Sequence, residues 1–320
     1  MKPVANIVFT KNRPLQLDAY LRSLYRFFPS DQIQTHIVYK AERFESEYEQ
    51  LLRKFPDSSV VRERDFHTDV MDILNNTESR YVLFGVDDTV FFDSVNFEVI
   101  EEAFARQSED IFGFTLRFGP DSLAETGDEI GRVTIASEPV YRLNWKDGQT
   151  AHTRYPFELG CTFYRTDLVR QILRDSMSSN RLAYRLFRPS SALAAVLGPL
   201  GRKRSTLKRL GYFFSPNTLE SWPCRWCCDH PEALPSFTYF QKLCAVAIQV
   251  NMVNTSTANE HYGTEEHTVE ALNEKYKQGY VLDIEHVAAS KPTEPGGGRE
   301  LFRLRLEAQP EPMATEHTGL

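Results

Sequence analysis

Two adjacent acids, Asp87 and Asp88, interrupt an apolar run that extends from Tyr81 to Phe92. The run is rich in β-branched and aromatic residues, which is typical of a strand buried on both faces of a parallel sheet. Because unpaired buried carboxylates are costly, the two acids must lie where the strand leaves the sheet, or hold a cation, or both. Two solvated acids in a turn are the alternative. Ligands of open α/β sheets bind at the carboxyl ends of strands, so the pair marks a candidate binding site.

Strands and amphipathic helices alternate along the chain up to this acid pair. The predicted strands and the helices between them cover residues 4–9, 15–28, 35–40, 44–52, 59–61, 66–74 and 81–92, in that order. This order and spacing predict a right-handed parallel α/β unit of the nucleotide-binding type over residues 1–92. The acid pair ends the fourth strand of that unit.

The pattern changes beyond residue 92. We expect helices over residues 95–104, 166–173, 236–250 and 268–278, strands over 111–116, 140–145 and 155–164, and a loop region with weak strands over 118–138. These elements predict a mixed second half over residues 93–290. The polar, glycine-rich sequence after Ser290 predicts a disordered tail over residues 291–320, because it offers too little apolar area to bury.

Composition excludes some classes of function. The chain has 320 residues, of which 41% are hydrophobic and 25% charged, as in an ordinary globular protein. A net charge of −7 argues against a general nucleic-acid binder, because phosphate neutralisation needs a basic surface. No apolar run reaches the length of about 18 residues that spans a bilayer, and Met1 leads straight into a predicted strand. We therefore expect a cytoplasmic protein.

A basic stretch stands out within the second half. Eight Arg and Lys residues lie between Arg181 and Arg209, around the apolar segment 192–197. The stretch is either an amphipathic element that associates with the inner face of the membrane or a surface insertion, and we favour the insertion.

Three of the five cysteines crowd together at Cys224, Cys227 and Cys228. An odd count does not make a disulfide framework. The spacing is too crowded for a zinc site, and no second Cys or His pair follows at zinc-finger spacing. We predict buried free thiols.

Two segments carry a resemblance to a known family. The opening Ile7-Val8-Phe9-Thr10-Lys11-Asn12-Arg13-Pro14, followed by a leucine-striped helix, resembles the start of family-2-like GT-A glycosyltransferases. In that fold the fourth strand ends in an Asp-x-Asp motif or a variant such as Glu-Asp-Asp, and the corresponding triplet here is Val86-Asp87-Asp88. The segment from Glu158 to Leu168 is similar to the acceptor-side segment of the family. The resemblance covers about the first 95 residues and residues 155–175.

The resemblance implies a GT-A fold, with a Rossmann-like, mostly parallel sheet flanked by helices and a mixed acceptor-side half. Residues 1–92 would bind the nucleotide-sugar, and residues 93–290 the acceptor. The implied activity is metal-dependent, inverting transfer of a sugar from a UDP-sugar to a hydroxyl of a glycan or lipid-linked acceptor, as in polysaccharide biosynthesis. Because the first acid of the motif is missing, a catalytically silent nucleotide- or glycan-binding protein of the same fold is the alternative.

The resemblance also suggests how a donor and a metal would be held. Mn²⁺ or Mg²⁺ would bind Asp88, with Asp87 on the metal or the ribose and His261 as the third ligand; His267 is the other candidate for that ligand. The residues at the ends of the first three strands would contact the donor, and these are Thr10, Asn12, Arg13, Lys40 and Asp65. An acid in the position of Asp65 would recognise a uracil-like imide. Helix entry and helix capping are the alternative roles of Asn12, Arg13 and Asp65.

Glu220 is the candidate general base for the acceptor hydroxyl. In the family this base lies at a helix start after the acceptor-side segment, and residues 215–222 predict such a start, with Glu220 in the first turn. We expect the helix N-terminus to lower its pKa and keep it ionised. Glu158 and Asp167 are the other candidates, and a plain helix-capping acid is the alternative role of Glu220.

Overall fold

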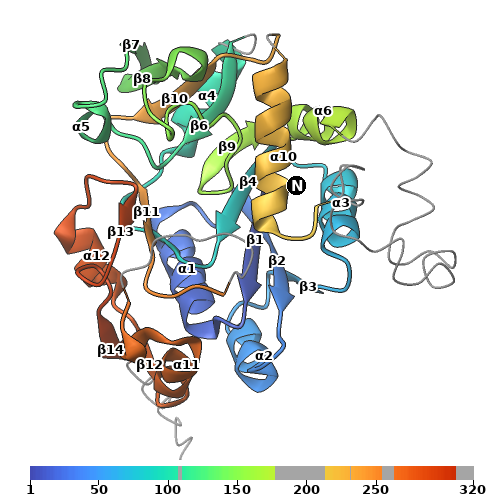
Figure 1. The fold of residues 1–320 in the computed structure, drawn as a ribbon, viewed down its shortest axis with the longest axis vertical. Helices are drawn as coiled ribbons and strands as arrows, with labels where there is room; N and C mark the ends of the chain where they lie inside the picture. The colour runs from blue at the N-terminus through green and yellow to red at the C-terminus, as the bar shows by residue number, and fades with distance from the viewer. Residues whose placement is uncertain (107–109, 177–212, 231, 254–262, 308–320) are drawn as a thin grey trace, which may run out of the picture.

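The computed structural model describes residues 1–106, 110–176, 213–230, 232–253 and 263–307. A nine-stranded mixed sheet runs through the molecule with the strand order β3-β2-β1-β4-β9-β6-β10-β8-β7, and helices lie on both of its faces (Figure 1). The prediction of an α/β fold with a parallel first half and a mixed second half is confirmed.

Four parallel strands form the first half of the sheet. They are β1 (Val4–Lys11), β2 (Ile33–Lys40), β3 (Ser59–Arg62) and β4 (Tyr81–Val86), and the helices between them are α1 (Pro14–Phe27), α2 (Glu45–Arg53) and α3 (Phe66–Asn76). Pro14 occupies the first position of α1, where its fixed φ fits and no hydrogen bond is lost. Because β1 pairs directly with β4, the carboxyl ends of these two strands lie side by side.

The second half of the sheet is mixed. Its strands are β6 (Ile111–Thr115), β7 (Ile130–Ile135), β8 (Glu138–Asn144), β9 (Thr162–Arg165) and β10 (Ser236–Phe240). The helices of this half are α4 (Phe97–Arg106), α5 (Pro120–Leu123), α6 (Thr166–Ser176), α10 (Pro216–Asp229) and the 3₁₀ turn η1 (Trp145–Asp147). The strand β9 runs antiparallel between β4 and β6, so it joins the two halves into one sheet.

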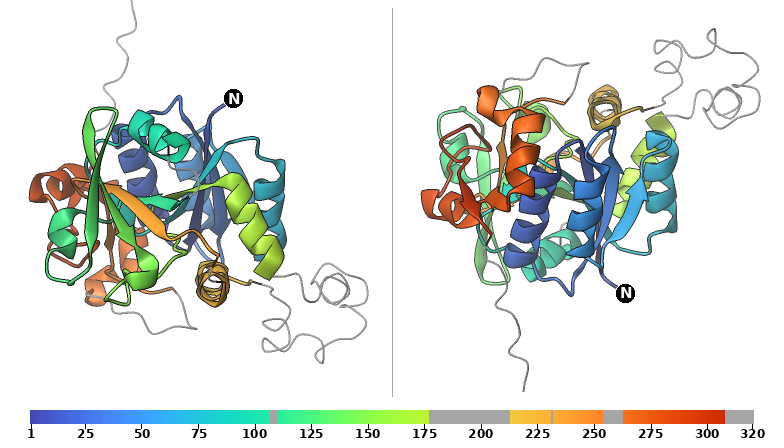
Figure 2. Two further views of the ribbon diagram at one scale, coloured as in Figure 1. Left: turned by 90° about the horizontal axis from the view of Figure 1, so that it is seen from above. Right: turned by 90° about the horizontal axis from the view of Figure 1, so that it is seen from below.

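Helices cover both faces of this sheet (Figure 2), and a large apolar core lies on each face. One contains buried side chains of α1, α2 and α4, and the other contains buried side chains of α3, α6 and α10. Alternate residues of β1 enter the two cores, Val4 and Val8 on one face and Ile7 and Phe9 on the other. Since both faces are apolar, polar side chains gather where the strands end.

Two small sheets bring the C-terminal part of the chain back to the first half. In one, β11 (Ala245–Ile248) pairs with β5 (Thr89–Phe91) and with β13 (Gly296–Gly297); in the other, β12 (Tyr280–Leu282) pairs with β14 (Leu304–Leu306). The helices of this region are η3 (Glu265–His267), α11 (Val269–Lys277) and α12 (Ile284–Ser290). Buried side chains of α11 and α12 join the core that contains α1.

The structure differs from the sequence predictions in three places. Residues 236–250 form β10 and β11 instead of a helix, because their β-branched and aromatic side chains pair with strands on both sides. Residues 291–307, predicted as part of a disordered tail, contain two strands and the buried Leu301. Of the strand predicted over 155–164, only the end forms β9. The basic stretch 181–209 and residues 308–320 lie outside the described residues.

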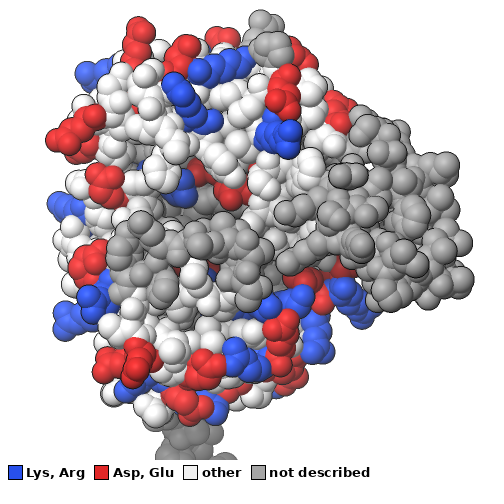
Figure 3. All heavy atoms as spheres, viewed as in Figure 1, with Lys and Arg blue, Asp and Glu red and all other residues white. Residues whose placement is uncertain are grey.

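The surface is mixed in charge. On the face shown in Figure 3, the described Lys and Arg side chains are interspersed with Asp and Glu. A charged ligand on this face would therefore be recognised by individual side chains and not by a broad field of one sign. Among the helices that the structure describes, none combines the length and apolar character needed to cross a membrane.

Gly85 precedes the acid pair at a point where α1 closely approaches β4. A Cβ atom there would clash with the phenol of Tyr20, whose oxygen accepts a hydrogen bond from Asn6 Nδ2 at 2.7 Å. Gly85→Ala should lower the free energy of unfolding in urea by about 1–3 kcal/mol through overpacking. Gly131→Ala is the control, because its Cβ would lie 3.7 Å from Arg142 Cβ, an ordinary contact. Equal stability of the two variants would contradict this account.

Candidate functional site

The acid pair lies in the turn between β4 and β5, where the chain leaves the nine-stranded sheet. The backbone N–H of Asp87 donates to Phe9 O of β1 at 3.2 Å, and the carbonyl of Asp88 accepts from Ile248 N of β11 at 2.8 Å. The pair is therefore held between the ends of β1 and β4 and the C-terminal part of the chain. This position at a strand exit is the one that the sequence predicted.

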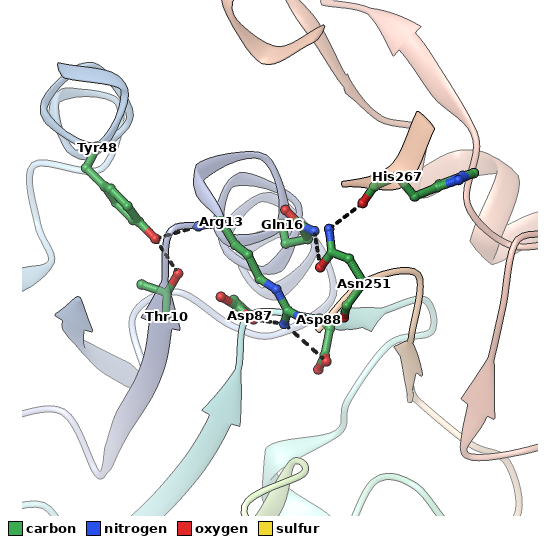
Figure 4. A network of polar contacts seen from close by, with 8 residues as sticks. All are labelled: Thr10, Arg13, Gln16, Tyr48, Asp87, Asp88, Asn251 and His267. Carbon is green, nitrogen blue, oxygen red and sulfur yellow. Dashed lines mark hydrogen bonds and ion pairs between the residues drawn. The ribbon is translucent and has the colours of Figure 1, made fainter. Parts of the chain in front are cut away.

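The Arg13 guanidinium is the counter-ion of both acids (Figure 4). Its Nη1 atom lies 2.9 Å from Asp87 Oδ1 and 3.5 Å from Asp88 Oδ2. Its Nη2 atom donates to the carbonyl of Asn251, and its backbone N–H donates to the Tyr48 hydroxyl at 2.9 Å. Arg13 is thus fixed at both ends and compensates charges that would be costly to bury alone.

The two acids differ in their exposure. The side chain of Asp87 is 5% exposed, whereas that of Asp88 is 22% exposed. Burial raises the pKa of Asp88; Arg13 opposes this effect, Asp87 adds to it, and the net shift is upward. Asp88 is the acid that a ligand can reach from solvent, and a bound cation would favour its ionised form.

The acid pair suits a divalent cation that is shared with a substrate. Mg²⁺ is commonly held by one or two carboxylates together with substrate phosphate oxygens, and Mn²⁺ also prefers oxygen ligands. Within the described ranges, no three His, Cys, Asp or Glu side chains cluster so as to hold a metal by themselves. The predicted third ligand, His261, lies outside the described residues. The Nδ1 atom of His267, the other candidate, lies 3.2 Å from the backbone nitrogen of Thr264.

The other predicted donor-binding residues lie at the carboxyl ends of β1, β2 and β3 or shortly after them, and each has a partner within the fold. Thr10 Oγ1 lies 2.7 Å from Tyr48 Oη, Asn12 accepts from the backbone N–H groups of Glu42 and Arg43, Lys40 lies 2.9 Å from Glu63, and Asp65 caps α3 by accepting from Thr68 N at 2.9 Å. Thr10 and Asn12 are buried, whereas Lys40 and Asp65 are partly exposed. Lys40 and Asp65 are therefore the more accessible to a ligand.

Glu220 lies on α10 beside the segment 158–161. Its Oε1 atom accepts a hydrogen bond from the Leu159 N–H at 3.2 Å. The helix begins at Pro216, so Glu220 occupies the fifth helical position instead of the first turn. Burial and the adjacent Glu158 raise the pKa of Glu220 to about 7. The predicted lowering is wrong, because burial and a like charge outweigh the helix dipole beyond the first turn.

Glu158, another candidate base, is buried and fully paired. It forms an ion pair with Arg117 Nη2, and its Oε1 atom accepts from Thr115 Oγ1 at 3.2 Å and from Thr162 Oγ1. Thr115 and Thr162 lie opposite each other on the neighbouring strands β6 and β9. The sheet itself therefore positions this carboxylate beside Glu220.

The segment 158–161 joins the Glu220 side of the site to the acid pair. Cys161 has a φ of 63°, a left-handed conformation that is uncommon outside glycine. Its backbone N–H donates to Phe84 O of β4 at 3.1 Å, and its carbonyl accepts from the Leu116 N–H, directly after β6, at 3.1 Å. The segment therefore lies between the carboxyl ends of β4 and β6, where both groups of acids are found.

Asp167 does not join this site. It is exposed in the first turn of α6, where its carboxylate accepts from the Leu168 N–H. Of the cysteines on α10, Cys224 and Cys227 are buried free thiols, as predicted, whereas Cys228 is exposed.

Three residues of the site were not predicted from the sequence. Arg117 is a charged residue two positions after the end of β6, where a ligand-edge residue is expected. Tyr48 lies on the apolar stripe of α2 and was indistinguishable from a core residue. Asn251 lies 238 residues from Arg13, so no local pattern connects the two.

Comparison with known proteins gives partial matches. No protein-family model matches this chain. Over 189 residues, 52% of this chain, the sequence is 23% identical to the bifunctional glycosyltransferase pgtA of Dictyostelium discoideum, and the match spans only 24% of that protein.

Solved structures of Staphylococcus aureus TarS also match part of the chain. The structure of TarS 1–349 is 19% identical with a TM-score of 0.37, covering 53% of this chain and 49% of that one. TarS 1–349 in complex with UDP is 18% identical with a TM-score of 0.38, covering 53% and 48%. Over half of its length, the chain is thus similar in sequence to a glycosyltransferase, and the family-2 assignment stays a prediction.

Proposed function

We propose that this chain is a glycosyltransferase that moves a sugar from a nucleotide-sugar donor to an acceptor hydroxyl. The observation that carries the proposal is the meeting of two unlike acid groups at one edge of the sheet. Asp87 and Asp88 with Arg13 suit a cation and a diphosphate, whereas the partly buried Glu220 suits a proton transfer. The 23% identity to a bifunctional glycosyltransferase supports this function.

On the donor side, Asp88 would hold Mn²⁺ or Mg²⁺ through its exposed carboxylate, with Asp87 on the cation or the ribose and His261 as the third ligand. When bound, the cation would neutralise charge that builds on the leaving diphosphate. Lys40 ends β2 and Asp65 follows β3, where the ribose and base of the donor are expected. The preference for a UDP-sugar rests on the resemblance of Asp65 to a uracil-binding acid.

On the acceptor side, Glu220 would act as the general base of an inverting transfer. It would take the proton of the acceptor hydroxyl as that oxygen bonds to the anomeric carbon and the bond from this carbon to the diphosphate oxygen breaks. A pKa of about 7 suits this role, because the carboxylate is then populated at neutral pH and is still basic enough to hold the proton. A glycan or lipid-linked acceptor and the cytoplasmic location remain predictions, and a membrane contact through residues 181–209 remains the less favoured alternative to a surface insertion.

The role of Asp88 can be tested by nucleotide binding. UDP should bind the wild-type chain more tightly by on the order of tenfold with Mn²⁺ than with a chelator, and Asp88→Asn should abolish that difference. The melting temperature should stay the same or rise, because one of two adjacent like charges is removed. Asp167→Asn, which changes an exposed acid outside the site, should keep the metal dependence. Calorimetry that gives the wild type equal affinity in both conditions would refute the metal site.

The role of Glu220 can be tested by transfer kinetics. Glu220→Gln should slow transfer by on the order of 10²–10⁴ while UDP affinity stays near that of the wild type. In the wild type, transfer should rise with pH through about 7, because the base acts only after it has lost its proton. Sugar transfer from UDP-sugars to a panel of glycan and lipid-linked acceptors, followed from pH 5 to 9, measures both effects.

Protein stability separates a catalytic loss from a folding defect. Because the pKa of Glu220 is raised in the folded state, the folded chain keeps the proton more tightly than the unfolded chain, and stability falls as pH rises toward and through 7. Glu220→Gln removes this effect, so the variant should be at least as stable as the wild type at pH 8. Transfer at the wild-type rate would show that the base is another residue. A wild type that binds UDP but transfers nothing would favour the silent binding protein.

A further inference from the structure

The buried ion pair of Arg117 and Glu158 lies beside Glu220, yet the proposed reaction gives it no role. The Arg117 and Glu158 side chains are 21% and 8% exposed. Hydrogen bonds from Thr115 and Thr162 hold the Glu158 carboxylate from two adjacent strands. A buried ion pair is weak evidence for stability in itself, so its function has to be sought in what it does to its neighbours.

One short segment positions the ion pair and Glu220 together. A Cβ atom at Gly160 would clash with Arg117 Nη1, so glycine lets the guanidinium lie against the backbone. The preceding residue, Leu159, donates its N–H to Glu220 Oε1 at 3.2 Å. The segment 158–161 therefore contains the anion of the pair, Glu158, the glycine against which the Arg117 guanidinium packs, and the N–H group that orients Glu220.

Charged and titratable groups face Glu220 from three elements. They are Glu158, Tyr155 and Tyr164 from the segment around β9, Arg117 after β6, and Cys224 on α10 itself. Burial raises the pKa values of both tyrosines and of Cys224 far above neutral, so these three stay uncharged at pH 7. Among the residues that the structure describes, the ion pair therefore supplies the fixed charges beside Glu220.

We propose that the Arg117–Glu158 ion pair is a positioning unit that orients Glu220 and determines its charge near neutral pH. The members act in opposite directions, since the Glu158 carboxylate disfavours a second negative charge and the Arg117 guanidinium favours it. The Glu158 carboxylate raises the pKa of Glu220, and the Arg117 guanidinium beside it opposes this effect. The consequence for catalysis rests on the proposed role of Glu220, whereas the charge coupling does not.

The coupling can be measured without donor, acceptor or turnover. NMR titration of ¹³C-labelled glutamate side chains in the full chain follows the Glu220 carboxyl group, and its signal is assigned as the one missing in Glu220→Gln. Glu158→Gln should lower the Glu220 midpoint by on the order of one pH unit, because a like charge is lost. Arg117→Met should raise the Glu220 midpoint, because a nearby opposite charge is lost. Arg117→Lys, which keeps the charge, should stay near the wild type.

Opposite shifts in the neutralising variants of Glu158 and Arg117 support the proposal. Unchanged midpoints, or shifts of the same sign, overturn it, because a merely structural ion pair would not move Glu220 in both directions. Should Arg117→Met fail to fold, Gly160→Ala displaces the guanidinium without removing a charge and should also raise the midpoint.

The proposed base and this ion-pair inference can fail separately. If the Glu220 midpoint shifts as expected but Glu220→Gln transfers sugar at the full rate, Glu220 is not the base, whereas the charge coupling stands. If the Glu220 midpoint is unchanged in the Glu158 and Arg117 variants but Glu220→Gln is inactive, the coupling is refuted, whereas Glu220 stands as the base. The acid limb of kcat/KM gives a second readout, because it should move with the NMR midpoint in each variant.

Discussion

The ion pairs between the Arg13 guanidinium and the carboxylates of Asp87 and Asp88 are the interaction on which the rest of the site depends. Two adjacent acids repel each other, and desolvation adds to the cost. A single buried cation offsets both effects and also donates to the carbonyl of Asn251. Loss of the Arg13 guanidinium would leave both acids without their counter-ion, and removing such a partner of a buried pair typically costs about 3–5 kcal/mol. The same contacts that neutralise the acids thus also bind the C-terminal part of the chain to the first half of the sheet.

The site has two pairs of neighbouring acids, Asp87 with Asp88 and Glu158 with Glu220, and each pair is close to one arginine. In each, an arginine lies against a buried carboxylate, whereas the neighbouring carboxylate is more exposed, as Asp88 is, or hydrogen-bonded to the backbone, as Glu220 is. Asp88 keeps part of its surface open to solvent, so a ligand cation can reach it. Burial and the charge of Glu158 raise the pKa of Glu220 to about 7, and the hydrogen bond from Leu159 opposes them. Environments that push the pKa values of nearby acids apart are typical of acid–base sites.

The parallel half of the fold was predictable because each of its elements has a clear period, and Asp87 and Asp88 were predictable because acids in an apolar run must mark a strand exit. The strands over 236–250 were not predictable, because a short apolar run is compatible with both helix and strand until its sheet partners are known. The raised pKa of Glu220 could not be predicted from the sequence either. Its pKa depends on burial and on Glu158, 62 positions earlier in the chain, and not on its own helix alone.

The contact between Arg13 and Asn251 has a consequence for the order of events during protein synthesis. The four strands of the first half are complete by residue 86, so they can pair while most of the chain is still unmade. Other partners of this region are synthesised much later. The strand β5 pairs with β11, which covers residues 245–248, and Arg13 donates to a carbonyl that lies 238 residues further along the chain. Closing such long loops costs conformational entropy and makes these contacts slow to form. On the ribosome, a chain shorter than 245 residues could already have paired the strands β1 to β4, but the turn with Asp87 and Asp88 would still lack its contacts with β11, and Arg13 its contact with Asn251.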